Sequence, residues 1–158
     1  MTSQALPQCE FEEKNLLVKV DLQVAGDVNA ISPVVSKVMG IINEMGCAVG
    51  HEFEIELALR EALANAIEHG AGHDSSKTIQ CSVACDHERG MLIVVRDPGA
   101  GFDPASLPSP VLGQNLFSTG GRGIYLINQL MDEVRFEKGG TEIHMIKRLK
   151  SPGNGGGR

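Results

Sequence analysis

The sequence predicts an α+β fold, a two-layer α/β sandwich in which one mostly antiparallel sheet is covered on one face by three helices. Two observations lead to this prediction. The β-rich segments come in neighbouring pairs joined by short polar or glycine-rich links, which is typical of antiparallel hairpins. The helical segments carry wide apolar surfaces that need a sheet to cover them. The 158 residues, 42% of them hydrophobic, suit one domain, which we place at residues 14–150.

The first part of the chain predicts a strand followed by a helix. Residues 1–13 are polar and lack a clear period, so we expect a loose lead-in. Residues 16–24 alternate in their second half between apolar and polar side chains, which predicts a half-buried strand. Ser32 followed by Pro33 is a typical N-cap and first helical position, and Gly46 predicts the end of this first helix.

The second helix has the clearest pattern in the chain. It is expected from about Glu52 to His69, because Ala, Leu and Glu fill this stretch and neither Pro nor Gly interrupts it. Gly70 and Gly72 predict its end. Apolar side chains occupy most of its circumference, so the helix should be largely buried; they are Ala58, Leu59, Ala62, Leu63, Ala66 and Ile67.

The second half of the chain predicts two hairpins separated by a loop and a third helix. Residues 77–85 and 91–96 are β-rich and joined by a polar link, so they should pair in an antiparallel hairpin. A long segment with several Pro, Gly and Ser follows, and we expect residues 102–121 to form a lid. The remaining elements are a third helix over 124–131, a hairpin of 134–137 with 141–149, and a disordered tail over 151–158.

Composition excludes several classes of function. The net charge of -6 and the pI near 5.3 argue against direct nucleic-acid binding and against binding to anionic membranes, because an acidic surface repels phosphate groups. No apolar run approaches membrane-spanning length, and Glu10, Glu12 and Glu13 stand where a signal peptide needs a basic start and an apolar stretch. We therefore expect a cytoplasmic protein without membrane contact.

Four cysteines, Cys9, Cys47, Cys81 and Cys85, lack the spacing of a disulfide framework. Cys81 and Cys85 with His73 and His87 form a conceivable zinc set, but a four-residue spacing on a strand offers no tight metal-binding turn. Buried, reduced thiols are the favoured interpretation.

Three stretches carry candidate functional residues. On the second helix, Glu61, Asn65 and His69 are spaced i, i+4 and i+8 and should form one polar row, facing either internal partners or a ligand. Asp97 opens an Asp-Pro-Gly segment that is either an ordinary turn or a place where the backbone can approach a planar ligand. Residues 120–123 precede the third helix as a hinge or as a phosphate-binding loop.

In their order along the chain, these stretches resemble the N, G1, G2 and G3 boxes of the GHKL ATPases, the superfamily of gyrase, histidine kinases and mismatch-repair ATPases. The four boxes are Glu61 with Asn65, residues 97–102, residues 121–124 and residues 140–143. Within the superfamily, the short length and the run from residue 121 into residues 131–134 resemble the stand-alone bacterial anti-sigma-factor serine/threonine kinases. The resemblance covers about residues 15–149 and implies the Bergerat ATPase fold.

The resemblance implies a role for each candidate residue. Asn65 would hold the Mg²⁺ that bridges the ATP phosphates, and Glu61 would act as general base. His69 would contact phosphate or a metal-bound water, with a packed structural histidine as the alternative. Asp97 would read the adenine amine, and Thr141 would support Asp97 or adenine through its hydroxyl. Room for base and ribose would come from Gly99 and Gly101, and the phosphates would be cradled by Gly121, Arg122 and Gly123.

The function implied is a Mg-ATP-dependent serine/threonine protein kinase and anti-sigma-type regulator that phosphorylates a small antagonist (anti-anti-sigma) protein in a partner-switching system. No phospho-accepting His is expected ahead of the ATPase core, so the acceptor should be a hydroxyl on another protein. A sigma factor as second partner and a homodimer are inherited from the resemblance. The alternatives are an ATP-sensing partner-switch protein without phosphotransfer and an ATP hydrolase of a larger machine.

Overall fold

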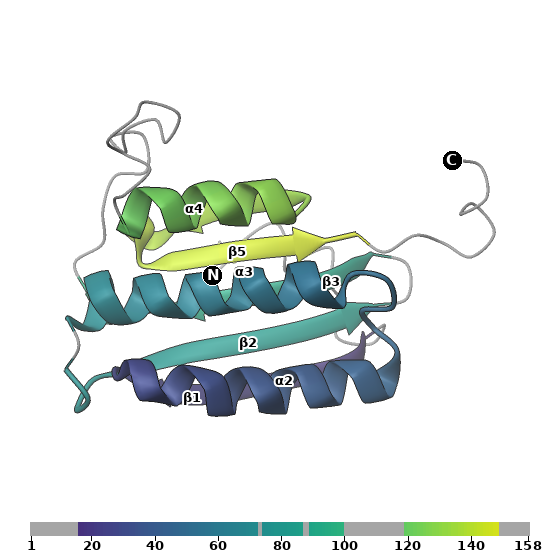
Figure 1. Cartoon of the computed structure of the whole chain (residues 1–158), viewed down its shortest axis with the longest axis horizontal. Helices are drawn as coiled ribbons and strands as arrows, with labels where there is room; N and C mark the ends of the chain where they lie inside the picture. The colour runs from purple at the N-terminus through teal and green to yellow at the C-terminus, as the bar shows by residue number, and fades with distance from the viewer. Residues whose placement is uncertain (1–15, 73, 87–88, 100–118, 149–158) are drawn as a thin grey trace.

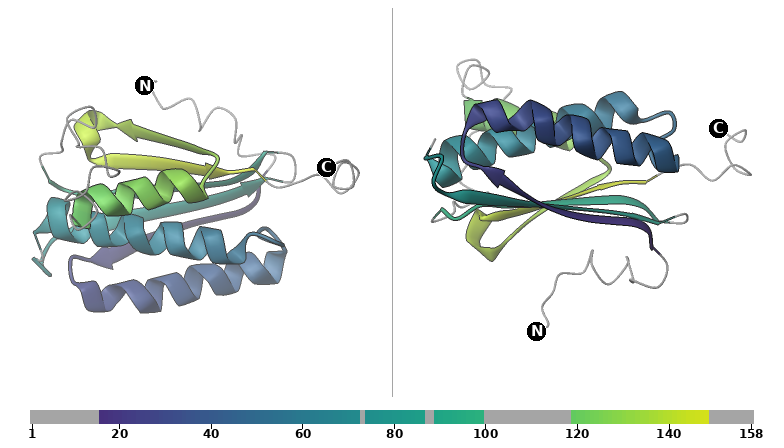
Figure 2. Two further views of the ribbon diagram at one scale, coloured as in Figure 1. Left: turned by 45° about the horizontal axis from the view of Figure 1, so that its top comes forward. Right: turned by 90° about the horizontal axis from the view of Figure 1, so that it is seen from below.

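The computed structural model describes residues 16–72, 74–86, 89–99 and 119–148 (Figure 1). Their five strands form one sheet in the order β1-β2-β3-β5-β4, and every neighbouring pair is antiparallel. Three α-helices cover one face of this sheet (Figure 2). The predicted two-layer α+β architecture is therefore confirmed. The strands are β1 (Leu16–Ala25), β2 (Thr78–Asp86), β3 (Gly90–Arg96), β4 (Glu133–Glu137) and β5 (Glu142–Lys147).

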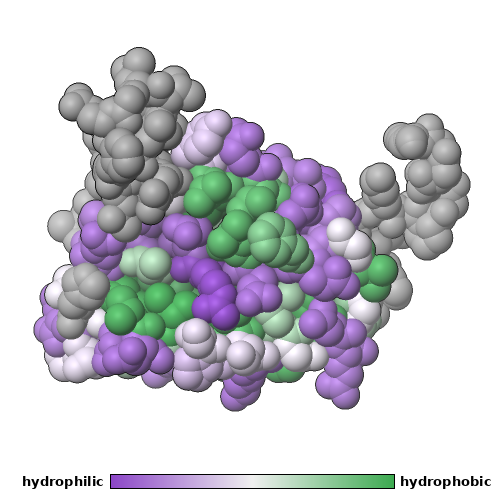
Figure 3. All heavy atoms as spheres, viewed as in Figure 1, coloured by the Kyte–Doolittle hydropathy of each residue, from purple (hydrophilic) through white to green (hydrophobic). Residues whose placement is uncertain are grey.

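The helical layer is centred on α3 (Glu52–Asn65). It lies between α2 (Ile31–Met45) on one side and α4 (Thr119–Leu130) on the other, and it contacts both (Figure 1). None of the helices in the described part of the chain is long and apolar enough to cross a bilayer. Figure 3 shows apolar surface over α4 and between α2 and α3, with polar side chains around it.

The core lies between the sheet and the helices. All six apolar residues predicted for the buried side of α3 are at most 5% exposed. They pack against the inward-facing side chains of the central strands, among them Cys81 and Cys85, which are buried free thiols. The β3 strand is buried on both faces, because Leu92 and Val94 join a second small cluster on the opposite side of the sheet.

The start of α2 differs from the prediction. It begins at Ile31, with Ala30 as an N-cap that makes no side-chain hydrogen bond, so Ser32 and Pro33 lie inside the helix. A short 3₁₀ turn, η2 (Val28–Ala30), precedes it, and the Asp27 carboxylate accepts the Asn29 N–H at 2.9 Å. The capping residue therefore stands five positions earlier than expected, since the 3₁₀ turn already orders the chain. The helix ends as predicted, with Gly46 at φ 75°.

The last turn of the long helix is wider than an α turn. After Asn65 the helix continues as a π-helical turn, η3 (Ala66–Ala71), and Gly72, one of the two predicted stop residues, ends it at φ 63°. Gly70 thus lies inside the helix and is not its stop signal. His69 therefore belongs to the π-helical turn and not to the α-helix that carries Glu61 and Asn65.

The start of α4 also differs from the prediction. The helix begins at Thr119, so the glycines expected in a loop ahead of it belong to its first two turns. The end of the predicted lid, 119–121, is accordingly helical, while its other residues lie outside the described part of the chain, as do the predicted lead-in and tail. The final hairpin is confirmed, with β4 and β5 joined through η6 (Lys138–Gly140).

Shortening a core side chain of α3 should cost far more stability than shortening an exposed one. Leu63 is fully buried, and we expect Leu63→Ala to lower the free energy of unfolding by about 2–5 kcal/mol. Phe53, on the same helix, is 75% exposed, and Phe53→Ala should change it by no more than about 0.5 kcal/mol. Urea unfolding of both variants measures the difference, and equal losses would contradict this account of the core.

Candidate functional site

The polar side chains of α3 meet α4 at a glycine. A Cβ atom placed on Gly123 would lie 2.9 Å from the Glu61 Oε1 atom and 3.1 Å from the Asn65 Nδ2 atom. Such distances are below normal van der Waals contact, so the acid and the amide occupy the space that any larger residue at position 123 would need. The structure thus brings Glu61, Asn65 and Gly123 together, as the resemblance implied.

Asn65 carries a polar atom that the protein leaves unused. Its Nδ2 atom is buried and has no hydrogen-bond partner within the described residues. A buried amide without a partner costs free energy, so its retention needs a compensating interaction. Because no described residue fixes the amide through this nitrogen, its oxygen can turn toward a ligand. A hard oxygen ligand of this kind fits Mg²⁺.

A second contact forms where η3 meets the end of β3. A Cβ atom on Gly70 would lie 2.2 Å from the Asp97 Cγ atom, and one on Gly99 would lie 2.8 Å from the Gly70 Cα atom. The helix end and the Asp97 turn therefore touch through two glycines without side chains between them. From the sequence, Gly70 was predicted only to end the helix. A glycine at this position has the same local sequence pattern whether it ends the helix or contacts Asp97, so no local signal marks this contact.

Asp97 is held at both its backbone and its carboxylate. Its N–H donates to the Thr141 carbonyl at 2.9 Å, and its Oδ1 atom accepts the Gly99 N–H at 2.8 Å. Burial raises the pKa of the Asp97 carboxyl above its ordinary value, opposed by the Gly99 N–H and by the nearby His69. The carboxylate is therefore oriented and partly desolvated, a state in which a hydrogen-bond donor on a ligand interacts strongly.

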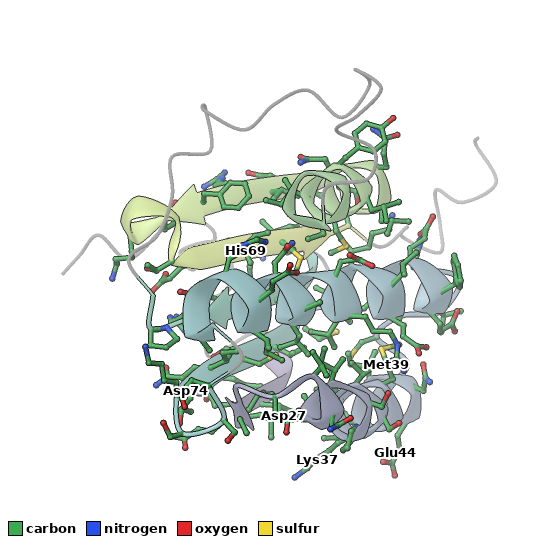
Figure 4. All side chains as sticks on the ribbon, turned by 60° about the vertical axis from the view of Figure 1, so that its left-hand side comes forward. Asp27, Lys37, Met39, Glu44, His69 and Asp74 are labelled. Atoms are coloured by element: carbon green, nitrogen blue, oxygen red, sulfur yellow. The ribbon has the colours of Figure 1, made fainter. Side chains whose placement is uncertain are left out.

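The structure places the Thr141 backbone beside Asp97 and leaves the His69 side chain half exposed. The Thr141 hydroxyl donates to the Lys138 carbonyl at 2.9 Å, so Thr141 supports Asp97 through its backbone carbonyl and not through its hydroxyl. The His69 side chain is 52% exposed, and its Nε2 atom lies 3.9 Å from Glu68 Oε1. In Figure 4, His69 is drawn on the side of the long helix that faces α4 and β5. It is not a packed core histidine.

The two contacts lie along a single helix. From Glu61 to Gly70 the chain advances nine residues, or about 13 Å at helical rise, which is a length that an extended nucleotide can span. Gly121 lies in the first turns of α4, where backbone N–H groups are not used within the helix. Gly101 and the side chain of Arg122 lie outside the described part of the chain, so their assigned roles stay predictions.

Comparison with known proteins shows the family to which this chain belongs. Residues 24–147 match the model of the histidine kinase-like ATPase domain. This chain belongs to that family. Its relatives include the serine-protein kinase RsbW of Bacillus licheniformis, 31% identical over 70% of this chain and 72% of the relative. The anti-sigma F factor of Clostridium novyi is 31% identical over 72% of this chain and 82% of the relative.

Further comparisons agree. RsbW of Bacillus subtilis is 26% identical over 86% of this chain and 89% of the relative. The solved RsbU and RsbW domains of Rv1364c from Mycobacterium tuberculosis superpose with a TM-score of 0.58 at 21% identity, covering 85% of this chain and 33% of that longer protein. The chain thus spans about a third of that protein's length, and this likeness concerns the fold alone. The predicted membership of the anti-sigma-factor kinase family, whose ATPase domain uses ATP, is confirmed.

A methyl group at position 123 should impair nucleotide binding more than folding. In Gly123→Ala the new Cβ displaces the ends of two side chains, Glu61 and Asn65, which can swing away without disturbing the backbone. We expect ATP affinity to fall by roughly tenfold or more, since small displacements in such sites are costly. The matched control is Gly40→Ala in α2, where no atom lies within 4 Å of the new Cβ.

The control variant should bind ATP as the wild type does and gain about 0.5–1 kcal/mol in stability, because alanine favours helix. Isothermal calorimetry and urea unfolding measure the two effects. Unchanged ATP affinity in Gly123→Ala would show that the space at position 123 is not part of the nucleotide site.

The Asp97 carboxyl should produce a pH-dependent stability difference. Because its pKa is raised in the folded protein, the folded state binds this proton more tightly than the unfolded state. The ionised carboxylate therefore lowers the free energy of unfolding above the raised pKa, and this effect is absent below the ordinary value of about 4. Asp97→Asn should raise the melting temperature slightly at about pH 7 and leave it unchanged near about pH 3. A gain of equal size at both pH values would contradict the burial effect.

Proposed function

We propose that this chain is a Mg-ATP-dependent serine/threonine protein kinase that phosphorylates a small antagonist protein and also acts as an anti-sigma factor. The observation that carries the proposal is the close approach of Gly123 to Glu61 and Asn65. It joins an acid suited to accept a proton, an amide suited to hold a metal, and the first turns of a helix suited to hold phosphate.

Each of the two contacts along the long helix binds a different part of the nucleotide. At the Gly70 end, the Asp97 carboxylate accepts a hydrogen bond from the adenine amine, while Gly99 leaves space for the base. At the Gly123 end, the free N–H groups in the first turn of α4 bind phosphate oxygens, aided by the helix dipole. His69, half exposed and next to Gly70, contacts a phosphate or a metal-bound water.

Asn65 is the residue that would hold Mg²⁺, through its side-chain oxygen. Its Nδ2 atom has no hydrogen-bond partner within the described residues, so no such bond keeps the amide from turning its oxygen toward an ion. Held there, the ion would supply positive charge to the phosphates of ATP.

Glu61 acts as the general base. Its carboxylate accepts the proton of the incoming hydroxyl while the hydroxyl oxygen forms its bond to the terminal phosphorus, and ADP leaves with the electron pair of the broken P–O bond. A serine or threonine hydroxyl is a weak nucleophile at neutral pH and needs such a base. One helical turn separates Glu61 from Asn65, so base and metal ligand are held by the same rigid element.

The names of the relatives support the two proposed protein partners. Proteins named serine-protein kinase and anti-sigma F factor are both similar to this chain, and together they support an antagonist protein as phospho-acceptor and a sigma factor as second partner. A homodimer is a further part of this proposal and rests on the family resemblance alone.

Replacing the base should abolish transfer and leave binding intact. We expect Glu61→Ala to slow ³²P transfer from ATP to a purified antagonist protein of the source organism by at least about 100-fold. The matched control is Glu56→Ala on the same helix, where the carboxylate pairs with Arg60 at 3.2 Å, and it should retain full activity. Equal transfer by the wild type and Glu61→Ala would defeat the base assignment. ATP binding without transfer in the wild type would favour an ATP-sensing switch instead.

A further inference from the structure

Lys147 is a buried cation at the end of β5. Its side chain is 9% exposed and lies on the inner face of the sheet, which is otherwise apolar along this strand. Burying an ammonium group is costly unless it is paired and hydrogen-bonded. The contacts that the Lys147 ammonium group makes must therefore offset the free-energy cost of its burial.

Those contacts join three elements. The Lys147 Nζ atom donates to the Leu130 carbonyl at 2.6 Å and lies 3.0 Å from Glu54 Oε1. Leu130 is the last residue of α4, whereas Glu54 lies in the first turn of α3. One ammonium group on the sheet therefore ties the end of α4 to the start of α3.

The electrostatic setting favours this bond. The carbonyls of the last helical turn have no partners within the helix, and a cation there also meets the negative end of the helix dipole. Glu54 is held by a second donor, the His51 Nδ1 atom at 3.0 Å. The His51 and Lys147 contacts lower the pKa of the Glu54 carboxyl, so the ion pair persists at neutral pH.

The same two helices meet again at the functional site. Gly123 stands seven residues before Leu130 on α4, and Glu61 stands seven residues after Glu54 on α3, about 10 Å along each helix. Because a helix is stiff over this length, fixing the two elements at one end restricts their movement at the other. Backbone bonding from Asp132 to Ile146 attaches the same junction to β5 but does not reach α3.

We propose that Lys147 is a positioning residue, which through Glu54 and the Leu130 carbonyl holds α4 against α3 so that Gly123 stays on Glu61 and Asn65. This rests on the proposed function of that contact in binding the ATP phosphates. The Asp97 end of the site does not involve α4, so it should not depend on Lys147.

Three variants test the assignment. Lys147→Met removes the ammonium group and keeps the alkyl stem, and Glu54→Gln removes the charge that pairs with it. The matched control is Arg148→Met, which removes a cation at the next position on the opposite face, where it pairs with Glu133 at 3.0 Å. Hydrogen exchange of the nucleotide-free protein and calorimetry with Mg-ATP and with AMP are measured for each.

In Lys147→Met, the amides of residues 124–130 should exchange about tenfold faster, and the affinity for ATP should fall about fivefold, while the affinity for AMP stays within about twofold. Glu54→Gln should show the same pattern in weaker form, and Arg148→Met should match the wild type. This split between ATP and AMP is not expected from a general loss of stability.

Unchanged exchange in α4 would overturn the proposal, and so would equal loss of affinity for ATP and AMP. Failure of the wild type to bind ATP at millimolar concentration would instead overturn the proposed function. In that case the exchange measurement on the nucleotide-free protein still decides whether Lys147 holds α4.

Discussion

The close approach of α4 to α3 at Gly123 is the constraint on which the rest of this structure depends. The α3 helix is buried on most of its circumference, so a polar side chain on it has to be matched by a partner or by a ligand. Because Gly123 has no side chain, the ends of the Glu61 and Asn65 side chains occupy the space beside it. A residue with a better helix propensity at position 123 would therefore displace both of these side chains.

A similar solution recurs at the other end of the same helix. The π turn brings Gly70 against the Asp97 carboxylate, and the contact again has no room for a Cβ atom. Glycine is unfavourable inside a helix, so its presence in η3 reflects the neighbour it must accommodate. Both glycine contacts thus lie along one central helix, whose position follows from the apolar side chains packed on the sheet beneath it.

The electrostatics of the chain are consistent with a local phosphate site on an acidic protein. With a net charge of -6, the molecule as a whole repels a polyanion such as ATP. In the proposed function, attraction comes from short-range sources, namely backbone N–H groups at the start of α4 and a divalent ion that Asn65 would hold.

The sequence by itself determined the fold class, the buried face of α3, both hairpins and the family, because these depend on periodic patterns and on short motifs in a given order. It also placed Glu61 and Asn65 one turn apart, since that spacing is a local property of a helix. Only the tertiary structure decided that α4 begins at Thr119, that the long helix continues through η3 to Ala71, and that Gly70 is a contact residue. Each of these depends on what lies across the packed interface, and the neighbour that sets the outcome, such as Asp97 beside Gly70, is distant along the chain.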